Sequence, residues 1–263
     1  MSAPGIEELL SEKQRRVMDR ALAEESSRRR HLVVALSGAH AYGFPSPDSD
    51  LDLKAIHVEP TEKLLGFGAA PMAADRLEVI DGVEIDYTSN ELKPVLHGVL
   101  AGNGNYLERI LGPVQPVVSP ELEELRPLVK SSLSKRLHRH YLGFATGQLK
   151  AFEADSPGSA KKVLYVLRTA LTGAHALRCG EIVTDLNDLV DDFGLGEARE
   201  LIVAKRAGEV SRLSPEMSAR WSARAREAFV ALEAALASSP LPDEPRGSGD
   251  LEAWLVALRR RGL

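Results

Sequence analysis

The sequence predicts an α+β protein, in which a small mixed β-sheet packed with helices is followed by an all-helical half. Short runs of β-branched and apolar residues, separated by turn residues, are concentrated in the first third of the chain. Longer runs with apolar residues three and four positions apart fill most of the remainder. These two patterns indicate two domains, residues 1–115 and residues 116–263.

The first domain is expected to begin with a helix over residues 6–27, where apolar residues recur at helical spacing. Strands are expected near residues 32–37, 51–58, 76–80 and 83–87. Asp81-Gly82 lies between two alternating runs, which is a strong hairpin signal. Residues 61–75 are expected to form a Gly/Ala loop. Thr88-Ser89-Asn90-Glu91 has the pattern of a capping box and predicts the start of a helix, whereas Pro94 implies a kink or a start slightly later.

The second domain is expected to be helical throughout. Ser119-Pro120-Glu121 and Ser214-Pro215-Glu216 each place a proline and an acid in a first helical turn. Helices are expected near residues 120–152, 159–178, 185–191, 196–208, 214–237 and 251–261. Residues 238–250 are rich in Pro, Gly and Ser and predict a linker.

The composition fits a soluble enzyme. The 263 residues include 44% hydrophobic and 5% aromatic residues, which allows a core but no row of stacking platforms for single-stranded nucleic acid. The formal net charge of -5 disfavours nucleic-acid binding over the whole surface, but it does not exclude a local basic groove. The single Cys179 excludes an intramolecular disulfide and a cysteine-rich zinc site. With no signal core and no membrane-length run, a cytoplasmic protein without a membrane partner is expected.

Residues 36–58 combine a glycine turn with two closely spaced acids. A β-like run ends in a Ser37-Gly38 turn, and Asp50-Leu51-Asp52 opens the next β-like run. Side chains two apart on a strand point to the same face, so Asp50 and Asp52 would lie side by side. Like charges at that separation need a cation between them. A strand, a glycine turn and a carboxylate pair are the smallest set of features that can bind a nucleoside triphosphate and its metal.

These residues resemble the nucleotidyltransferase superfamily that includes DNA polymerase beta, whose pattern is a Gly-Ser turn followed about ten residues later by Asp-x-Asp. The longer strings Ser37–Phe44 and Ser49–Lys54 resemble its YcgL-type branch of predicted bacterial and phage nucleotidyltransferases. The resemblance is strong over residues 32–58, moderate to about 110 and weak to about 190. One position departs from the pattern, because Ala39 stands where the family has a serine that helps to hold the triphosphate.

The resemblance implies a third carboxylate on a neighbouring strand. Glu84 and Asp86 share one face of the strand expected at 83–87. Asp86 is the expected ligand, because its place before Thr88 matches the family, and Glu84 is the alternative. The competing interpretation is that both are solvated residues of an edge strand. Asp50, Asp52 and Asp86 would then be the catalytic residues that bind two Mg²⁺ ions, with Mn²⁺ as an alternative metal.

The triphosphate is expected to contact Ser37 and Gly38 of the turn, whose backbone N–H groups can cradle phosphate. Lys54 shares the face of Asp52, so it is a candidate for a phosphate contact or for neutralising the acids. Lys161 and Arg168 share one face of a predicted helix and are candidates for binding the triphosphate tail. A solvated helix face is an equally weighted alternative for these two residues.

The histidines are interpreted separately. His40 lies in the turn and could touch phosphate or acceptor, whereas His57 faces away from the carboxylates and is interpreted as structural. His138 and His140 are two apart on a helix, which argues against a metal site. Arg168 and His175 match an Arg-x6-His spacing that weakly resembles the HEPN ribonuclease motif.

The expected reaction moves a nucleoside monophosphate from a triphosphate, with ATP as the expected nucleotide, to an acceptor hydroxyl and releases pyrophosphate. The acceptor stays open among a small molecule, an RNA 3′ end and a protein hydroxyl, and nucleic acid is therefore an undecided partner. One alternative is a catalytically weakened, nucleotide-binding regulatory protein, which Ala39 favours. A ribonuclease centred on Arg168 and His175 is the less favoured alternative.

Overall fold

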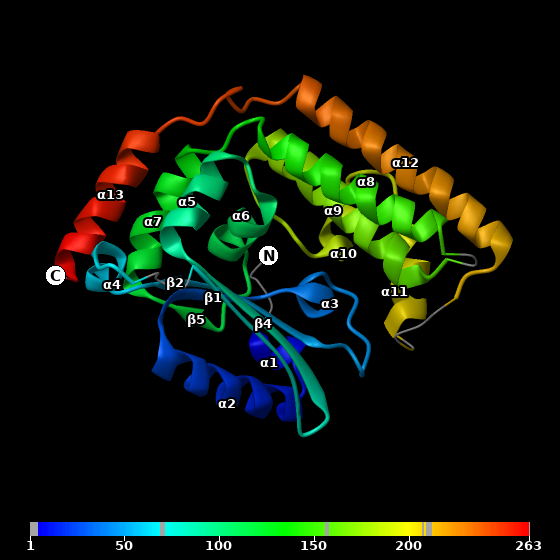
Figure 1. Cartoon of the computed structure of the whole chain (residues 1–263). Coiled ribbons are helices and arrows are strands. Elements are labelled where there is room, and N and C mark those ends of the chain that lie inside the picture. Colours follow the sequence, from blue (N-terminus) through cyan, green and yellow to red (C-terminus); the bar gives the residue numbers. More distant parts are fainter. Residues whose placement is uncertain (1–4, 69–71, 156–157, 207, 209–211, 263) are drawn as a thin grey trace. The chain divides into compact units, whose positions relative to one another are not determined.

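The computed structural model describes residues 5–68, 72–155, 158–206, 208 and 212–262, and it places a five-stranded mixed sheet among helices. The strand order is β3-β4-β2-β1-β5. In chain order the strands are β1 (Arg30–Leu36), β2 (Leu51–Val58), β3 (Ala73–Ile80), β4 (Val83–Glu91) and β5 (Val117–Val118). β2 and β4 pair in parallel and the other neighbours pair antiparallel. The predicted α+β class is confirmed (Figure 1).

The chain forms two compact units that do not follow a single cut in the sequence. The sheet unit contains Met1–Gly38, Asp50–Leu133 and Pro245–Leu263. The helical unit contains Ala39–Ser49 and Ser134–Glu244. The segment between β1 and β2 therefore packs with the helical unit, although both of its neighbours belong to the sheet unit. The division into domains 1–115 and 116–263 stays a prediction.

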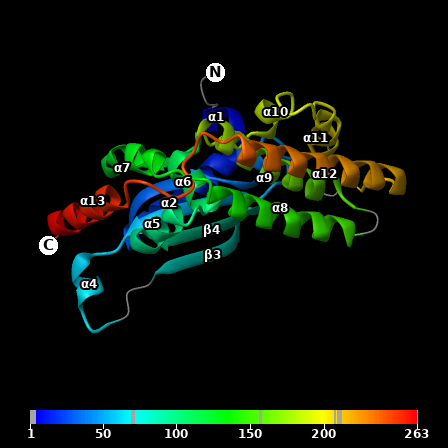
Figure 2. The same ribbon diagram turned by 90° about the horizontal axis from the view of Figure 1, so that it is seen from above.

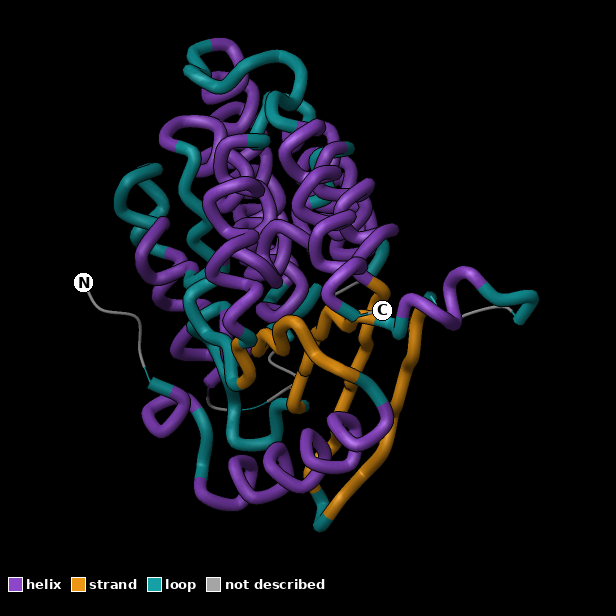
Figure 3. Tube along the Cα trace, turned by 90° about the vertical axis from the view of Figure 1, so that its left-hand side faces the viewer, coloured by secondary structure: helices purple, strands orange, loops and turns teal. Residues whose placement is uncertain are grey.

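One face of the sheet is covered by α2 (Glu12–Arg28), which follows the short α1 (Ile6–Leu9) (Figure 3). Val17, Met18 and Ala21 of α2 pack with the inward residues of the strands, including Leu51, Leu53, Ile85 and Tyr87. The single helix predicted over 6–27 is interrupted because Ser11 caps a new helix. Its hydroxyl accepts the Gln14 backbone N–H at 3.3 Å, and the Gln14 side chain completes a capping box.

The opposite face of the sheet is contacted by α5 (Leu92–Leu100) and α6 (Gly104–Leu111). α7 (Pro120–Ser131) and α13 (Ser248–Arg261) pack against each other (Figure 2). α4 (Thr61–Leu65) follows β2. The Asn103 side chain caps α6 by accepting the Asn105 backbone N–H at 3.0 Å.

The hairpin prediction is confirmed, and two neighbouring predictions are wrong. Asp81 and Gly82 have φ values of 49° and 73°, as a two-residue type I′ turn requires. β4 continues through Thr88-Ser89-Asn90-Glu91, because these residues pair with β2 as far as His57. α5 begins only after Glu91, which agrees with the later start that Pro94 implied. Within the range 61–75, α4 and the start of β3 replace the predicted loop, and residues 69–71 lie outside the described part of the chain.

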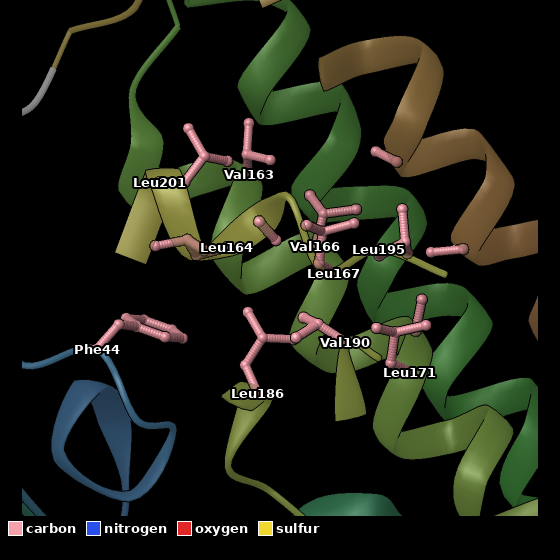
Figure 4. Packing of buried hydrophobic residues seen from close by; sticks show 14 of the residues in the cluster. Phe44, Val163, Leu164, Val166, Leu167, Leu171, Leu186, Val190, Leu195 and Leu201 are labelled. Carbon is pink, nitrogen blue, oxygen red and sulfur yellow. The ribbon is translucent and has the colours of Figure 1, made fainter. Parts of the chain in front are cut away.

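The helical unit is built around α9 (Ala160–Cys179), against which α8 (Leu137–Glu153) and α12 (Pro215–Ala237) pack. The short helices α10 (Leu186–Leu189) and α11 (Ala198–Arg206) also contact α9. Figure 4 shows Phe44 beside Leu164 and Leu186 in this core. The single helix predicted over 120–152 is wrong, since it is broken at 132–136, where Ser132 bonds the Val129 carbonyl at 2.8 Å. Residue 207 of the helix predicted over 196–208 lies outside the described residues.

Candidate active site

Two carboxylates lie side by side on the face of the sheet opposite α2. Asp52 of β2 and Asp86 of β4 are direct partners in the parallel register. The Lys54 ammonium lies 2.8 Å from Asp86 Oδ1 and 3.9 Å from Asp52 Oδ1. It also donates to the Asp86 backbone carbonyl at 3.3 Å. The two acids therefore share a cation, and whether Lys54 neutralises them or contacts phosphate stays a prediction.

The glycine turn lies directly against Asp52. Gly38 has a φ of 63°, and an added Cβ would come within 3.0 Å of Asp52 Oδ2. The Ser37 backbone N–H donates to the Asp52 carbonyl at 2.9 Å. Glycine is required here for two reasons, since the backbone conformation is left-handed and the carboxylate occupies the space of a side chain. The predicted neighbours Ser37, Gly38 and Asp52 are brought together.

Asp50 is placed differently from Asp52. It is half-buried and immediately precedes β2, which begins at Leu51. Among the described residues, no group of three or more His, Cys, Asp or Glu side chains is arranged to hold a metal ion. The carboxylate oxygens of Asp52 and Asp86 fit a hard divalent cation in donor chemistry, and the Lys54 ammonium lies between them. The three-carboxylate metal site stays a prediction.

The register separates the two candidates for the third carboxylate. Glu84 is exposed and pairs with Val79 of β3, whereas the pairing of β4 with β2 begins one residue later, at Ile85. Asp86 therefore lies beside Asp52 and Glu84 does not. This arrangement favours Asp86 as the third functional acid.

Ala39, which replaces the family serine, is buried in the apolar core of the helical unit. Its neighbours in that core include Tyr42 and Phe44. The methyl group is therefore part of a packed hydrophobic cluster.

Lys161 and Arg168 both lie on α9 in the helical unit. Lys161 lines a pocket of about 640 Å³ together with Lys162, Arg212 and Tyr165. Arg168 is buried, and its guanidinium lies 3.8 Å from the centre of the Tyr42 ring. The solvated-face interpretation is therefore wrong for Arg168. Whether either side chain binds a triphosphate stays a prediction.

The histidines differ in their surroundings. His57 is buried, with Nδ1 2.7 Å from the Ser89 hydroxyl, which agrees with its structural interpretation. His40 is also buried. Burial, with a smaller effect from Arg168, lowers the pKa of His140 to about 4, and this ring stacks on Phe144. His138 bonds Glu233 at 3.0 Å. Burial also lowers the pKa of His175.

Sequence reasoning missed Lys205. This lysine of α11 is fully buried and donates to the hydroxyls of Ser46 at 2.6 Å and Ser49 at 3.4 Å. It therefore anchors the segment that leads into Asp50. The signal was present, because Lys205 continues the apolar stripe of Ala198, Leu201 and Ile202 at helical spacing.

A glycine turn against a carboxylate, with a second carboxylate on the next parallel strand, is the arrangement that the resemblance to polymerase beta-type nucleotidyltransferases implied. Over residues 11–257 the chain matches the model of RlaP, the RNA repair pathway DNA polymerase beta family, and it belongs to this family. This family membership supports the assignment of the chain to the nucleotidyltransferases. None of the described helices has both the length and the apolar character of a membrane span.

Two relatives are similar over most of the chain. The uncharacterized protein MJ0002 of Methanocaldococcus jannaschii is 28% identical over 229 residues, covering 84% of this chain and 91% of the relative. The uncharacterized protein YcgL of Bacillus subtilis is 28% identical over 203 residues, covering 74% and 77%. A crystal structure of a nucleotidyltransferase-like protein from Exiguobacterium sibiricum matches 93% of this chain and 79% of its own at 12% identity. Its TM-score of 0.34 is too low to support an argument.

Proposed function

We propose that the protein is a metal-dependent nucleotidyltransferase that moves a nucleoside monophosphate, with ATP as the donor, to a hydroxyl of an RNA end in the cytoplasm. The observation that supports this most directly is the pairing of Asp52 with Asp86 next to the Gly38 turn. The RNA acceptor is supported by the family description, which names an RNA repair pathway.

In the proposed reaction the acceptor oxygen attacks the α-phosphorus, a new P–O bond forms, and the bond to the β-phosphate oxygen breaks so that pyrophosphate leaves. Asp86 accepts the hydroxyl proton. The Gly38 N–H and the Ser37 hydroxyl are the proposed phosphate donors of the turn, because the Ser37 N–H is already bonded to the Asp52 carbonyl. Oxygens of Asp50, Asp52 and Asp86 would hold Mg²⁺ or Mn²⁺, which neutralises phosphate charge and lowers the pKa of an acceptor hydroxyl.

Three basic residues are part of the proposal. Lys54 lies between the same two carboxylates, where its ammonium can pair with a phosphate oxygen of the bound nucleotide. Lys161 and Arg168 are proposed to bind the triphosphate tail and the leaving pyrophosphate. Lys161 has the stronger support, because it lines a pocket, whereas Arg168 is buried against Tyr42.

The test is transfer of α-labelled nucleotide to RNA and release of pyrophosphate by wild type, Asp52→Asn, Asp86→Asn and Glu84→Gln. We expect the two aspartate variants to lose at least about 100-fold in rate, in the range of a lost general base or ligand. Glu84→Gln is the matched control and should keep transfer within about twofold, since Glu84 is exposed and lies beyond the register with β2. Full activity of Asp52→Asn would rule out this assignment.

A second candidate is a catalytically weakened protein that holds a nucleotide and regulates a partner. The position of Ala39 favours it, because a buried methyl group stands where the family has a phosphate-binding hydroxyl. Saturable binding of a nucleoside triphosphate without pyrophosphate release, with every nucleotide and with RNA present, would favour this function over transfer.

A further inference from the structure

A strongly basic pocket lies in the sheet unit at the end of β2 that is remote from Asp52. Its volume is about 570 Å³. The cations that line it are Arg28, Arg29, Arg30, Lys63 and Arg259, and Glu59 contributes a carboxylate. They come from three parts of the chain, the α2–β1 junction, α4 and the end of α13. We call this cavity the basic pocket.

Buried acids hold these cations in place. Glu25 is 2% exposed and is bonded by three guanidinium groups, those of Arg28, Arg29 and Arg76. Arg76 is also paired with Glu24 and Glu78, so Arg28 and Arg29 share Glu25, and the charged side chains that line the pocket itself are five cations and the one carboxylate of Glu59. Each arginine has five N–H donors, and a bond to a buried acid uses one or two of them. The remaining donors are available to a ligand.

The other cations are anchored in the same way. The buried Glu59 bonds Lys63 at 3.3 Å, the fully buried Glu91 bonds Arg259, and Glu121 of α7 bonds Arg30. Arg259 also donates to the Glu59 carbonyl at 2.7 Å. Arg28, Lys63 and Arg30 are 61%, 58% and 51% exposed at the side chain, so their charged ends reach solvent. The pocket therefore combines cations that are anchored by carboxylates with charged side-chain ends that are exposed to solvent.

We propose that the basic pocket binds backbone phosphates of the single-stranded RNA whose end is the acceptor, an inference that rests on the proposed function. Four of the five cations are arginines, whose planar donor fork matches phosphate oxygens. The chain as a whole carries a net charge of -5, so phosphate binding has to be local. Asp52 and Val58 are six residues apart on β2, which places the pocket roughly 20 Å from the carboxylates. An RNA held in the basic pocket gains binding affinity at a distance from its reacting end.

The test is equilibrium binding of a short labelled single-stranded RNA to the full chain at several salt concentrations, without nucleotide. The variant Arg28→Gln/Arg30→Gln/Lys63→Gln removes three charges from the pocket. We expect weaker binding to every sequence and a plot of log K against log salt that is shallower by about 2, since each phosphate contact on a single strand contributes about 0.7. The matched control Arg16→Gln/Arg20→Gln/Arg226→Gln removes three exposed arginines from other surfaces and should keep the wild-type slope.

Equal slopes for the two triple variants would overturn the proposal, as would the absence of RNA binding by wild type at low salt. Competition by polyglutamate as strong as by RNA would also overturn it, in favour of a site for acidic polymers. If the pocket triple does not fold, Arg28→Gln/Arg30→Gln should lower the slope by about 1.4. Repeating the binding with Asp52→Asn separates this inference from the proposed function. The Asp52→Asn variant should still bind RNA. If wild type binds RNA but transfers no nucleotide, the proposed function is contradicted and the RNA-binding inference is not.

Discussion

At the scale of single residues, Gly38 places the turn after β1 directly against the Asp52 carboxylate. Its left-handed backbone and the nearby Asp52 Oδ2 both require glycine. A substitution at this position therefore changes the carboxylate as well as the turn. This makes Gly38 a sensitive probe of the site.

For Gly38→Ala we expect transfer to fall by roughly 100-fold, because the added methyl displaces the Asp52 carboxylate by a distance on the scale that catalysis does not tolerate. Gly194 provides the matched control, since its φ is 66° and an added Cβ meets no atom within 4 Å. Gly194→Ala should cost about 1–2 kcal/mol of stability and keep transfer. Label transfer and thermal unfolding of both variants check this, and equal losses of transfer would contradict it.

At the scale of elements, the segment from Ala39 to Ser49 is anchored by the helical unit along its length. The Gly43 carbonyl accepts bonds from Asn187 at 3.0 Å and from Arg206 at 2.8 Å. Phe44 is fully buried in the core of the unit. The segment begins after Gly38 and ends before Asp50, so the chain leaves the sheet unit and returns to it at these two residues.

Lys205→Met tests this anchoring. The variant keeps an apolar stem of similar length and leaves the buried hydroxyls of Ser46 and Ser49 without the ammonium donor. We expect a loss of about 1–3 kcal/mol in the free energy of unfolding and slower transfer at a temperature where the variant is folded. Lys150→Met, at an exposed position of α8, is the control and should change neither quantity. Unchanged stability of Lys205→Met in denaturant unfolding would refute the anchoring role.

At the scale of the whole molecule, buried neutral histidines link folding to pH. His31 Nε2 lies 2.7 Å from the Tyr87 hydroxyl, and Nδ1 lies 3.1 Å from the Ser26 hydroxyl. Burial, followed by the charges of Arg29 and His57, lowers the pKa of His31 from 6.5 to about 4. The unfolded chain therefore binds a proton that the folded chain excludes between these two values.

Stability should consequently fall as pH decreases from 6.5 to 4, with a contribution from His31 of up to about 3 kcal/mol. His31→Gln should flatten this part of the profile, although the lowered pKa of His140 leaves a remaining slope of the same sign. Denaturant unfolding at a series of pH values measures the effect. His97→Gln, at an exposed position of α5, is the control and should keep the wild-type profile. An unchanged profile for His31→Gln would show that the histidine is not the source.

The sequence by itself determined the elements whose signals are local. The strands around the Ser37-Gly38 turn, the Asp81-Gly82 hairpin and the helices that begin at Pro120 and Pro215 follow from alternation and turn chemistry between near neighbours. Only the tertiary structure decided the parallel pairing of β2 with β4, which places Asp86 rather than Glu84 beside Asp52. It also decided that Thr88–Glu91 form a strand, and that Lys205 supports a segment more than 150 residues away in the chain. These outcomes depend on backbone pairing and burial between distant segments, which no local pattern encodes.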